Sequence, residues 1–213
     1  MDVVLEVGAK RVFATAVDWP GWSRSARTEE AALEALLSYA DRYAPVARLA
    51  GLQLPPDTTT HVVETVKGNA TTDFGAPAIA VRADFRPVGR PDAKRLAALV
   101  TASWETLDGV AADAPAQLRK GPRGGGRDRD KMLAHVASAE AAYARKSGVR
   151  LREPAPGDRA AWVANRAALL AVLGAPSDGE RLVQPTGWPQ RYAAQRIAWH
   201  VLDHAWEMQD RSG

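Results

Sequence analysis

Residues 192–211, YAAQRIAWHVLDHAWEMQDR, place an H-x-x-x-H pair in a stretch with helical periodicity. A spacing of four residues brings His200 and His204 to one helix face, one turn apart. Ile197 and Val201 share that face, so both imidazoles are expected to point toward the interior of the protein. The stretch therefore predicts a buried helix that carries candidate metal ligands.

A third histidine, His135, lies on the apolar face of another helical stretch, DKMLAHVASAEAAYARK at residues 130–146. Three buried neutral imidazoles need polar partners, and one divalent ion satisfies all of them. We therefore predict a metal site at His135, His200 and His204. Three histidines with an open position are a catalytic arrangement for zinc, and the all-nitrogen set also suits nickel, iron or copper. The alternative is that these are ordinary core histidines.

The pattern of the 213-residue chain changes near residue 90. Alternating apolar residues precede this point, and amphipathic helical segments follow it, so we expect an α+β protein. Its N-terminal domain, residues 1–90, is expected to have the order β-β-α-β-β, and residues 91–213 are expected to form a four-helix bundle. The expected strands cover 3–7, 12–17, 60–68 and 78–88. The expected helices cover 28–50, 92–112, 129–146, 157–173 and 190–210.

The helical half resembles the DinB/YfiT-like superfamily, whose members are four-helix bundles with a histidine on the second helix and H-x-x-x-H on the last. The matching positions are His135 in MLAHVASAEAAY, and His200 and His204 in AWHVLDHAWE. The resemblance covers residues 92–210 and implies a divalent metal on these three side chains. It also implies hydrolysis, or a transfer or isomerisation that uses a low-molecular-weight thiol. The sequence has no cysteine, so such a thiol has to arrive on a co-substrate.

The N-terminal half resembles HicB-like αβ domains. The resemblance rests on residues 12–43, VFATAVDWPGWSRSARTEEAALEALLSYADRY, which resemble the pattern of a strand, a D-x-P-G turn, a second strand and a helix opened by T-x-E-E-A-L, with TEEAAL at residues 28–33 in the place of that opening. Trp19 and Trp22 replace the more usual residues around the turn. No DNA-binding segment of the kind found in antitoxins follows, so we expect a scaffold, a dimerisation module or a wall of the active site.

A basic, glycine-rich loop, RKGPRGGGRDRDK at residues 119–131, leads directly into the His135 helix. Its glycines allow close approach of backbone N–H groups to a ligand, and arginines can hold a carboxylate or phosphate through two parallel hydrogen bonds. We expect Arg123 and Arg127, with Lys120, to bind an anionic group of the substrate. The alternative is a solvated connector.

Three further side chains were weighed for a role at the site. Tyr143 is a candidate proton donor, although core packing is the simpler interpretation. Glu207 is a candidate base, or a partner that orients a ligating histidine, and the alternative is a solvated helix-end charge. His61 lies in an expected strand of the first half and is interpreted as structural.

Composition limits the function classes. No apolar run reaches the roughly 20 residues that a membrane span needs, and the N-terminus lacks the layout of a signal peptide, so a cytoplasmic location is expected. The net charge of +3 and one basic loop make a nucleic-acid partner the last choice.

We therefore expect a metal-dependent enzyme, a hydrolase or a thiol-dependent transferase or isomerase, that acts on a small anionic substrate. The alternative is a non-enzymatic, metal-stabilised regulatory protein that acts through its HicB-like half. A homodimer is compatible with either.

Overall fold

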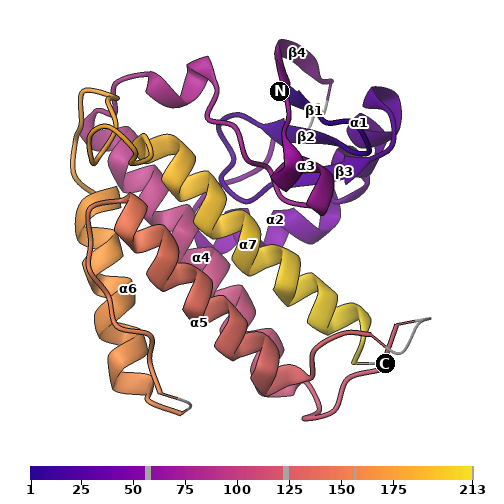
Figure 1. Cartoon of the computed structure of the whole chain (residues 1–213), viewed down its shortest axis with the longest axis vertical. Helices are drawn as coiled ribbons and strands as arrows, with labels where there is room; N and C mark the ends of the chain where they lie inside the picture. The colour runs from indigo at the N-terminus through magenta and orange to yellow at the C-terminus, as the bar shows by residue number, and fades with distance from the viewer. Residues whose placement is uncertain (56–58, 122–124, 156, 213) are drawn as a thin grey trace.

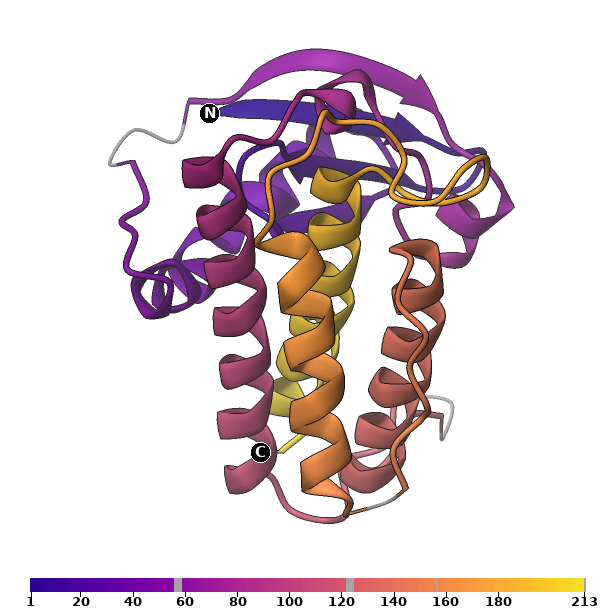
Figure 2. The same ribbon diagram turned by 90° about the vertical axis from the view of Figure 1, so that its left-hand side faces the viewer.

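The computed structural model of the protein describes residues 1–55, 59–121, 125–155 and 157–212. It has a mixed α+β fold in which a four-stranded sheet from the N-terminal part of the chain is followed by long helices (Figure 1). In Figure 2, α4 and α5 stand on either side of α7 below the sheet. No helix in the described segments is both long enough and apolar enough to cross a bilayer.

The sheet has the strand order β3-β2-β1-β4. Its strands are β1 (Asp2–Val7), β2 (Val12–Ala16), β3 (Ser23–Ala26) and β4 (His61–Lys67). The first three strands pair antiparallel, and β4 returns to pair parallel with β1. The strands β1, β2 and β4 confirm those expected at 3–7, 12–17 and 60–68, and β3 follows the D-x-P-G turn.

The single helix expected at 28–50 is two helices, α1 (Glu29–Ser38) and α2 (Ala40–Leu49). Thr28 caps α1 as its side chain accepts a hydrogen bond from the Ala31 N–H. At Tyr39 the backbone leaves the helical region, and its ring packs edge-on against Trp206 of α7 with 5.1 Å between ring centroids. This tertiary contact stabilises a turn that periodicity alone does not reveal.

The strand expected at 78–88 is absent, so the predicted order β-β-α-β-β is wrong. The structure instead has the short helix α3 (Ala70–Phe74), an extended segment and the 3-10 helix η1 (Arg82–Phe85). Carboxylate groups accept hydrogen bonds from the backbone N–H groups that would pair with a neighbouring strand in a sheet. Glu6 accepts from Ala78 and Ile79, Asp84 accepts from Val81, and Glu64 accepts from Arg82. Side chains on both sides of the segment thus replace a neighbouring strand as its hydrogen-bond partners.

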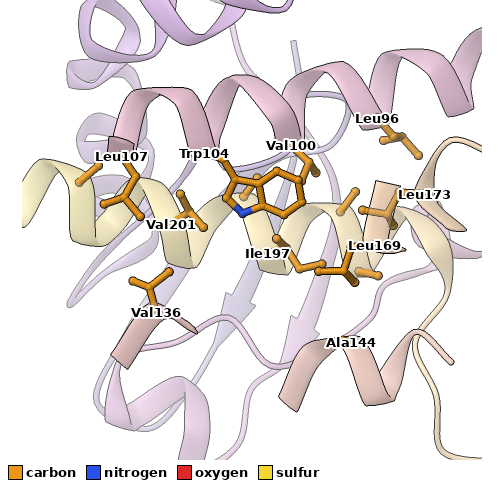
Figure 3. Packing of buried hydrophobic residues seen from close by; sticks show 14 of the residues in the cluster. Leu96, Val100, Trp104, Leu107, Val136, Ala144, Leu169, Leu173, Ile197 and Val201 are labelled. Carbon is orange, nitrogen blue, oxygen red and sulfur yellow. The ribbon is translucent and has the colours of Figure 1, made fainter. Parts of the chain in front are cut away.

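The four expected helices of the second half are all present. They are α4 (Arg90–Asp113), α5 (Arg129–Lys146), α6 (Arg159–Leu173) and α7 (Gln190–Asp210). Their buried faces form one core, with Trp104 of α4 packed among aliphatic side chains of α6 and α7 (Figure 3). Because α7 contacts the three other helices, it is buried along most of its length.

A second core crosses the boundary expected at residue 90. It contains the inner side chains of the sheet and of α1 and α2, and it is completed by Leu99 of α4 and by Leu202 and Trp206 of α7. Gly21 shows how close this contact is: its φ is 93°, and a Cβ there would lie 2.7 Å from Leu202 Cδ1. The sheet and the helices therefore share α7 as a common wall.

Candidate metal centre

The three expected ligands meet between two helices. His135 comes from α5, and His200 and His204 come from α7, with one ligand nitrogen of each within 4.8 Å of the others. The Nε2 atoms of His135 and His200 are 3.2 Å apart. A set of nitrogens converging on one point from three rings is the arrangement that a transition-metal ion requires.

Burial favours the neutral form of these rings. His200 is buried, and this burial, followed by the charges of His204 and Arg196, holds its pKa well below the usual value. The pKa of the partly exposed His135 is also lowered, first by burial and then by His204 and Arg127. A neutral imidazole has the lone pair that a metal needs, so the environment prepares these side chains for ligation.

A carboxylate fixes the orientation of His204. Its Nδ1 is 3.0 Å from Glu207 Oε2, and the other carboxylate oxygen accepts from Arg211 Nη1 at 2.8 Å. The hydrogen bond to His204 is the largest cause that lowers the pKa of the Glu207 carboxyl, and the hydrogen bond to Arg211 lowers it further. With Nδ1 occupied, Nε2 of His204 is the nitrogen left for a metal, which is the usual division of roles between the two ring nitrogens of a ligating histidine. Glu207 is thus placed as a positioning residue.

The glycine-rich loop docks against the end of α7 beside this carboxylate. Gly126 has a φ of 111°, and a Cβ there would lie 2.6 Å from Arg211 Cζ. Arg119 donates its backbone N–H to Arg211 O at 2.9 Å. The loop therefore packs on the helix that carries two of the histidines, and the positive φ favours glycine at position 126.

The three cationic residues that were predicted to bind an anion differ in their surroundings. Lys120 pairs with Asp128, and so its ammonium is already partly neutralised. Arg127 is exposed, and its charge contributes to the low pKa of His135 and of His200. Arg123 lies outside the described residues. Among the described residues of this predicted clamp, Arg127 is thus the one whose charge acts on the histidines.

Aromatic rings line the side of the centre that faces away from the loop. Tyr143 of α5 lies edge-on to His200, with 5.6 Å between ring centroids, and burial raises the pKa of its hydroxyl. Trp188 packs against Tyr143 at 5.1 Å and against Tyr192 at the same separation. Tyr143 thus lies within reach of a ligand at the histidines and stays protonated at neutral pH.

No known family matches this chain. No family model, no curated protein and no solved structure is similar to it. Both family resemblances stay predictions, and the case for a metal rests on the geometry of the three histidines.

His61 and two acidic side chains of α5 and α7 lie away from the histidines. His61 is exposed on the edge strand β4. Asp203 pairs with Arg24 at 3.0 Å, on a different side of α7 from the ligating face. Glu140 of α5 is buried and accepts a hydrogen bond from the Trp104 ring N–H in the core, where burial raises its pKa to about 7. His61, Asp203 and Glu140 thus do not belong to the histidine cluster.

One functional candidate was missed. Arg196 precedes His200 by four residues and therefore lies on the face that carries the ligands, one turn toward the N-terminus of α7. It is buried, and its guanidinium lies over the rings of Tyr143 and Trp199, at 5.1 Å and 4.7 Å from their centroids. A charged residue in register with buried histidines was the signal available in the sequence.

Proposed function

We propose that this protein is a metal-dependent enzyme of the DinB/YfiT-like type, in which helices α4 to α7 form the four-helix bundle and a divalent ion binds His135, His200 and His204. Zinc is the first choice of metal. The observation that carries the proposal is the convergence of three ligand nitrogens within 4.8 Å between α5 and α7. His135 is partly exposed, which supports access of a small molecule to the ion.

When bound, the ion supplies a Lewis acid with an open coordination position, suited to hydrolysis or to transfer or isomerisation with a thiol co-substrate. The chain's own residues hold and surround that position. Glu207 fixes the ring of His204, Tyr143 offers a protonated hydroxyl beside His200, and Arg127 adds positive charge for an anionic substrate. These assignments fit a small anionic substrate.

Metal analysis of the purified protein tests the proposal. We expect close to one divalent ion per chain in the wild type and in His61→Ala, and no stoichiometric metal in His200→Ala. His61 is a matched control because it is a histidine that lies on the exposed edge strand rather than at the centre. A wild type that takes up no divalent ion, even when zinc is supplied in excess, refutes the proposal.

A second candidate is a non-enzymatic binding protein with a structural metal. It is favoured by apolar side chains exposed on the sheet half, among them Val62 and Val63 of β4 and Phe74 of α3, which is 90% exposed. X-ray absorption of the metal-loaded protein separates the two. Three nitrogen ligands with a labile position support the enzyme, whereas a fourth protein ligand supports a structural role.

A further inference from the structure

A small cavity lies between the sheet, the segment before η1 and the first half of α7. Its volume is about 30 Å³, which is room for about two water molecules. The apolar part of its wall comes mainly from Val4, Val17, Pro77 and Ile79, and its polar part includes Gln195 and Arg196. None of the three histidines lines the cavity, although Arg196 lies one turn before His200 on α7.

Two polar donors in this wall lack partners. Arg196 Nη1 and Gln195 Nε2 are buried nitrogens with no hydrogen-bond partner in the described part of the chain. Their residues are only 7% and 8% exposed. The other end of the Gln195 amide is held in place, because Oε1 accepts from the Gly21 N–H at 3.0 Å. Two unsatisfied donors on side chains that line one cavity indicate room for an acceptor.

The guanidinium of Arg196 also lacks a countercharge in contact with it. Within the described segments it forms no ion pair, although Glu6 and Asp84 line the same cavity. The Glu6 carboxylate accepts from the Thr72 hydroxyl and from the Ala78 and Ile79 N–H groups. Asp84 accepts from Val81, and burial raises its pKa to about 7.

A buried cation without a partner is costly, and the two aromatic rings that flank Arg196 offset only part of that cost. We propose that the cavity is a binding site for the carboxylate group of a small monocarboxylic acid, held by Arg196 with help from Gln195. A planar carboxylate matches the fork of a guanidinium, and one of its oxygens can accept from the orphaned Nη1 of Arg196.

The size and lining of the cavity define the ligand class. A volume of about 30 Å³ suits a carboxylate with a very short tail. The neighbouring acids Glu6 and Asp84 disfavour a dianion. The assignment goes beyond the proposed function, since nothing in it requires a metal at the histidines.

Sodium formate is the probe, titrated against sodium chloride at constant sodium concentration. Binding is measured in every variant by the increase in Tm, and in the proteins that retain Arg196 also by the shift of its side-chain ¹⁵N signal. We expect saturable binding to the wild type that Arg196→Met weakens at least about tenfold, because a charge-assisted bidentate pair is lost. Arg191→Met is the matched control, since this arginine of the same helix is already paired with Asp92 at 2.6 Å.

His200→Ala keeps this test separate from the metal centre, where formate could also bind. Retained formate binding in His200→Ala supports the cavity, even if metal analysis contradicts the proposed enzyme. Binding that His200→Ala abolishes and Arg196→Met leaves intact overturns the assignment. Equal responses to formate and chloride also overturn it, because they indicate a general anion effect rather than a carboxylate site.

The stability of Arg196→Met adds a readout that is independent of ligand. If Arg196 only packs between Tyr143 and Trp199, its loss lowers Tm. If it is held ready for an anion, Met removes an unpaired buried charge, and Tm without formate is unchanged or higher.

Discussion

Glu140→Gln is expected to stabilise the protein at alkaline pH and to leave its stability unchanged in acid. Glu140 is only 6% exposed and lies in the core between α5 and α4, where the ring N–H of Trp104 donates to its Oε1. Burial raises its pKa from 4.5 to about 7, with Arg166 acting in the opposite direction. The folded protein thus favours the protonated acid.

The magnitude follows from the difference between these two pKa values. Below about pH 4.5 the carboxyl is protonated in both the folded and the unfolded chain, and it contributes no penalty. Between 4.5 and about 7 only the unfolded chain releases the proton, so the free energy of unfolding decreases as the pH rises. Above the folded pKa the full loss is reached, and it amounts to roughly 3 kcal/mol. Gln cannot ionise, and its amide oxygen can still accept from Trp104.

Urea unfolding followed by tryptophan fluorescence, repeated from about pH 4.5 to about pH 8.5, measures the effect. The stability of Glu140→Gln relative to the wild type should rise with pH, toward roughly 3 kcal/mol. Glu105→Gln on the exposed side of α4 is the control and should show no such trend. A difference that is constant with pH, or a wild type that is the more stable protein at high pH, would refute the reasoning. It would mean that Arg166 keeps Glu140 ionised.

Three further outcomes are expected. Zinc at a hundredfold excess over its Kd should stabilise the wild type by about 2.7 kcal/mol in thermal unfolding, because the ion binds only the folded arrangement of the histidines. EDTA should reverse the stabilisation. An unchanged unfolding transition after zinc is added would contradict this prediction. Glu207→Gln should weaken metal affinity about 10- to 100-fold in a chelator competition, because the carboxylate that orients His204 is lost while the ligands remain; an unchanged affinity would show that Glu207 is only a surface charge. Gly21→Ala should lower the free energy of unfolding by more than about 1 kcal/mol, since both the positive φ and the contact with Leu202 exclude a side chain. Gly51→Ala is the control for backbone strain alone, because φ is 73° there but a Cβ meets no atom within 4 Å.

The sequence predicted the four helices of the second half and the three histidines that come together, because both depend on local periodicity. The spacing of His200 and His204 determines that they share a face, and the apolar residues around His135 determine that its face is buried. That the faces of α5 and α7 are opposed to one another depends on packing, so periodicity alone indicates two buried faces and not the contact between them.

The prediction was wrong where the hydrogen-bond partners are distant in sequence. Residues 78–88 have a pattern typical of a strand, but Glu6 and Glu64 reach their backbone from β1 and β4. Nothing within the segment reveals those carboxylates. The sites of Arg196 and Gln195 were missed for the same reason, since their cavity is formed by strands and loops more than a hundred residues away.

The burial of α7 between two cores has a consequence for how this chain can evolve. A single inserted residue rotates everything beyond it by about 100°. On a helix with one buried face, such a change disturbs one contact surface and can be repaired by a few substitutions. Here it would turn Leu202 and Trp206 out of one core and Met208 out of the other, together with both histidines. Packing in each of the two cores therefore fixes the register of α7. Insertions and deletions are expected to be tolerated in loops rather than in this helix.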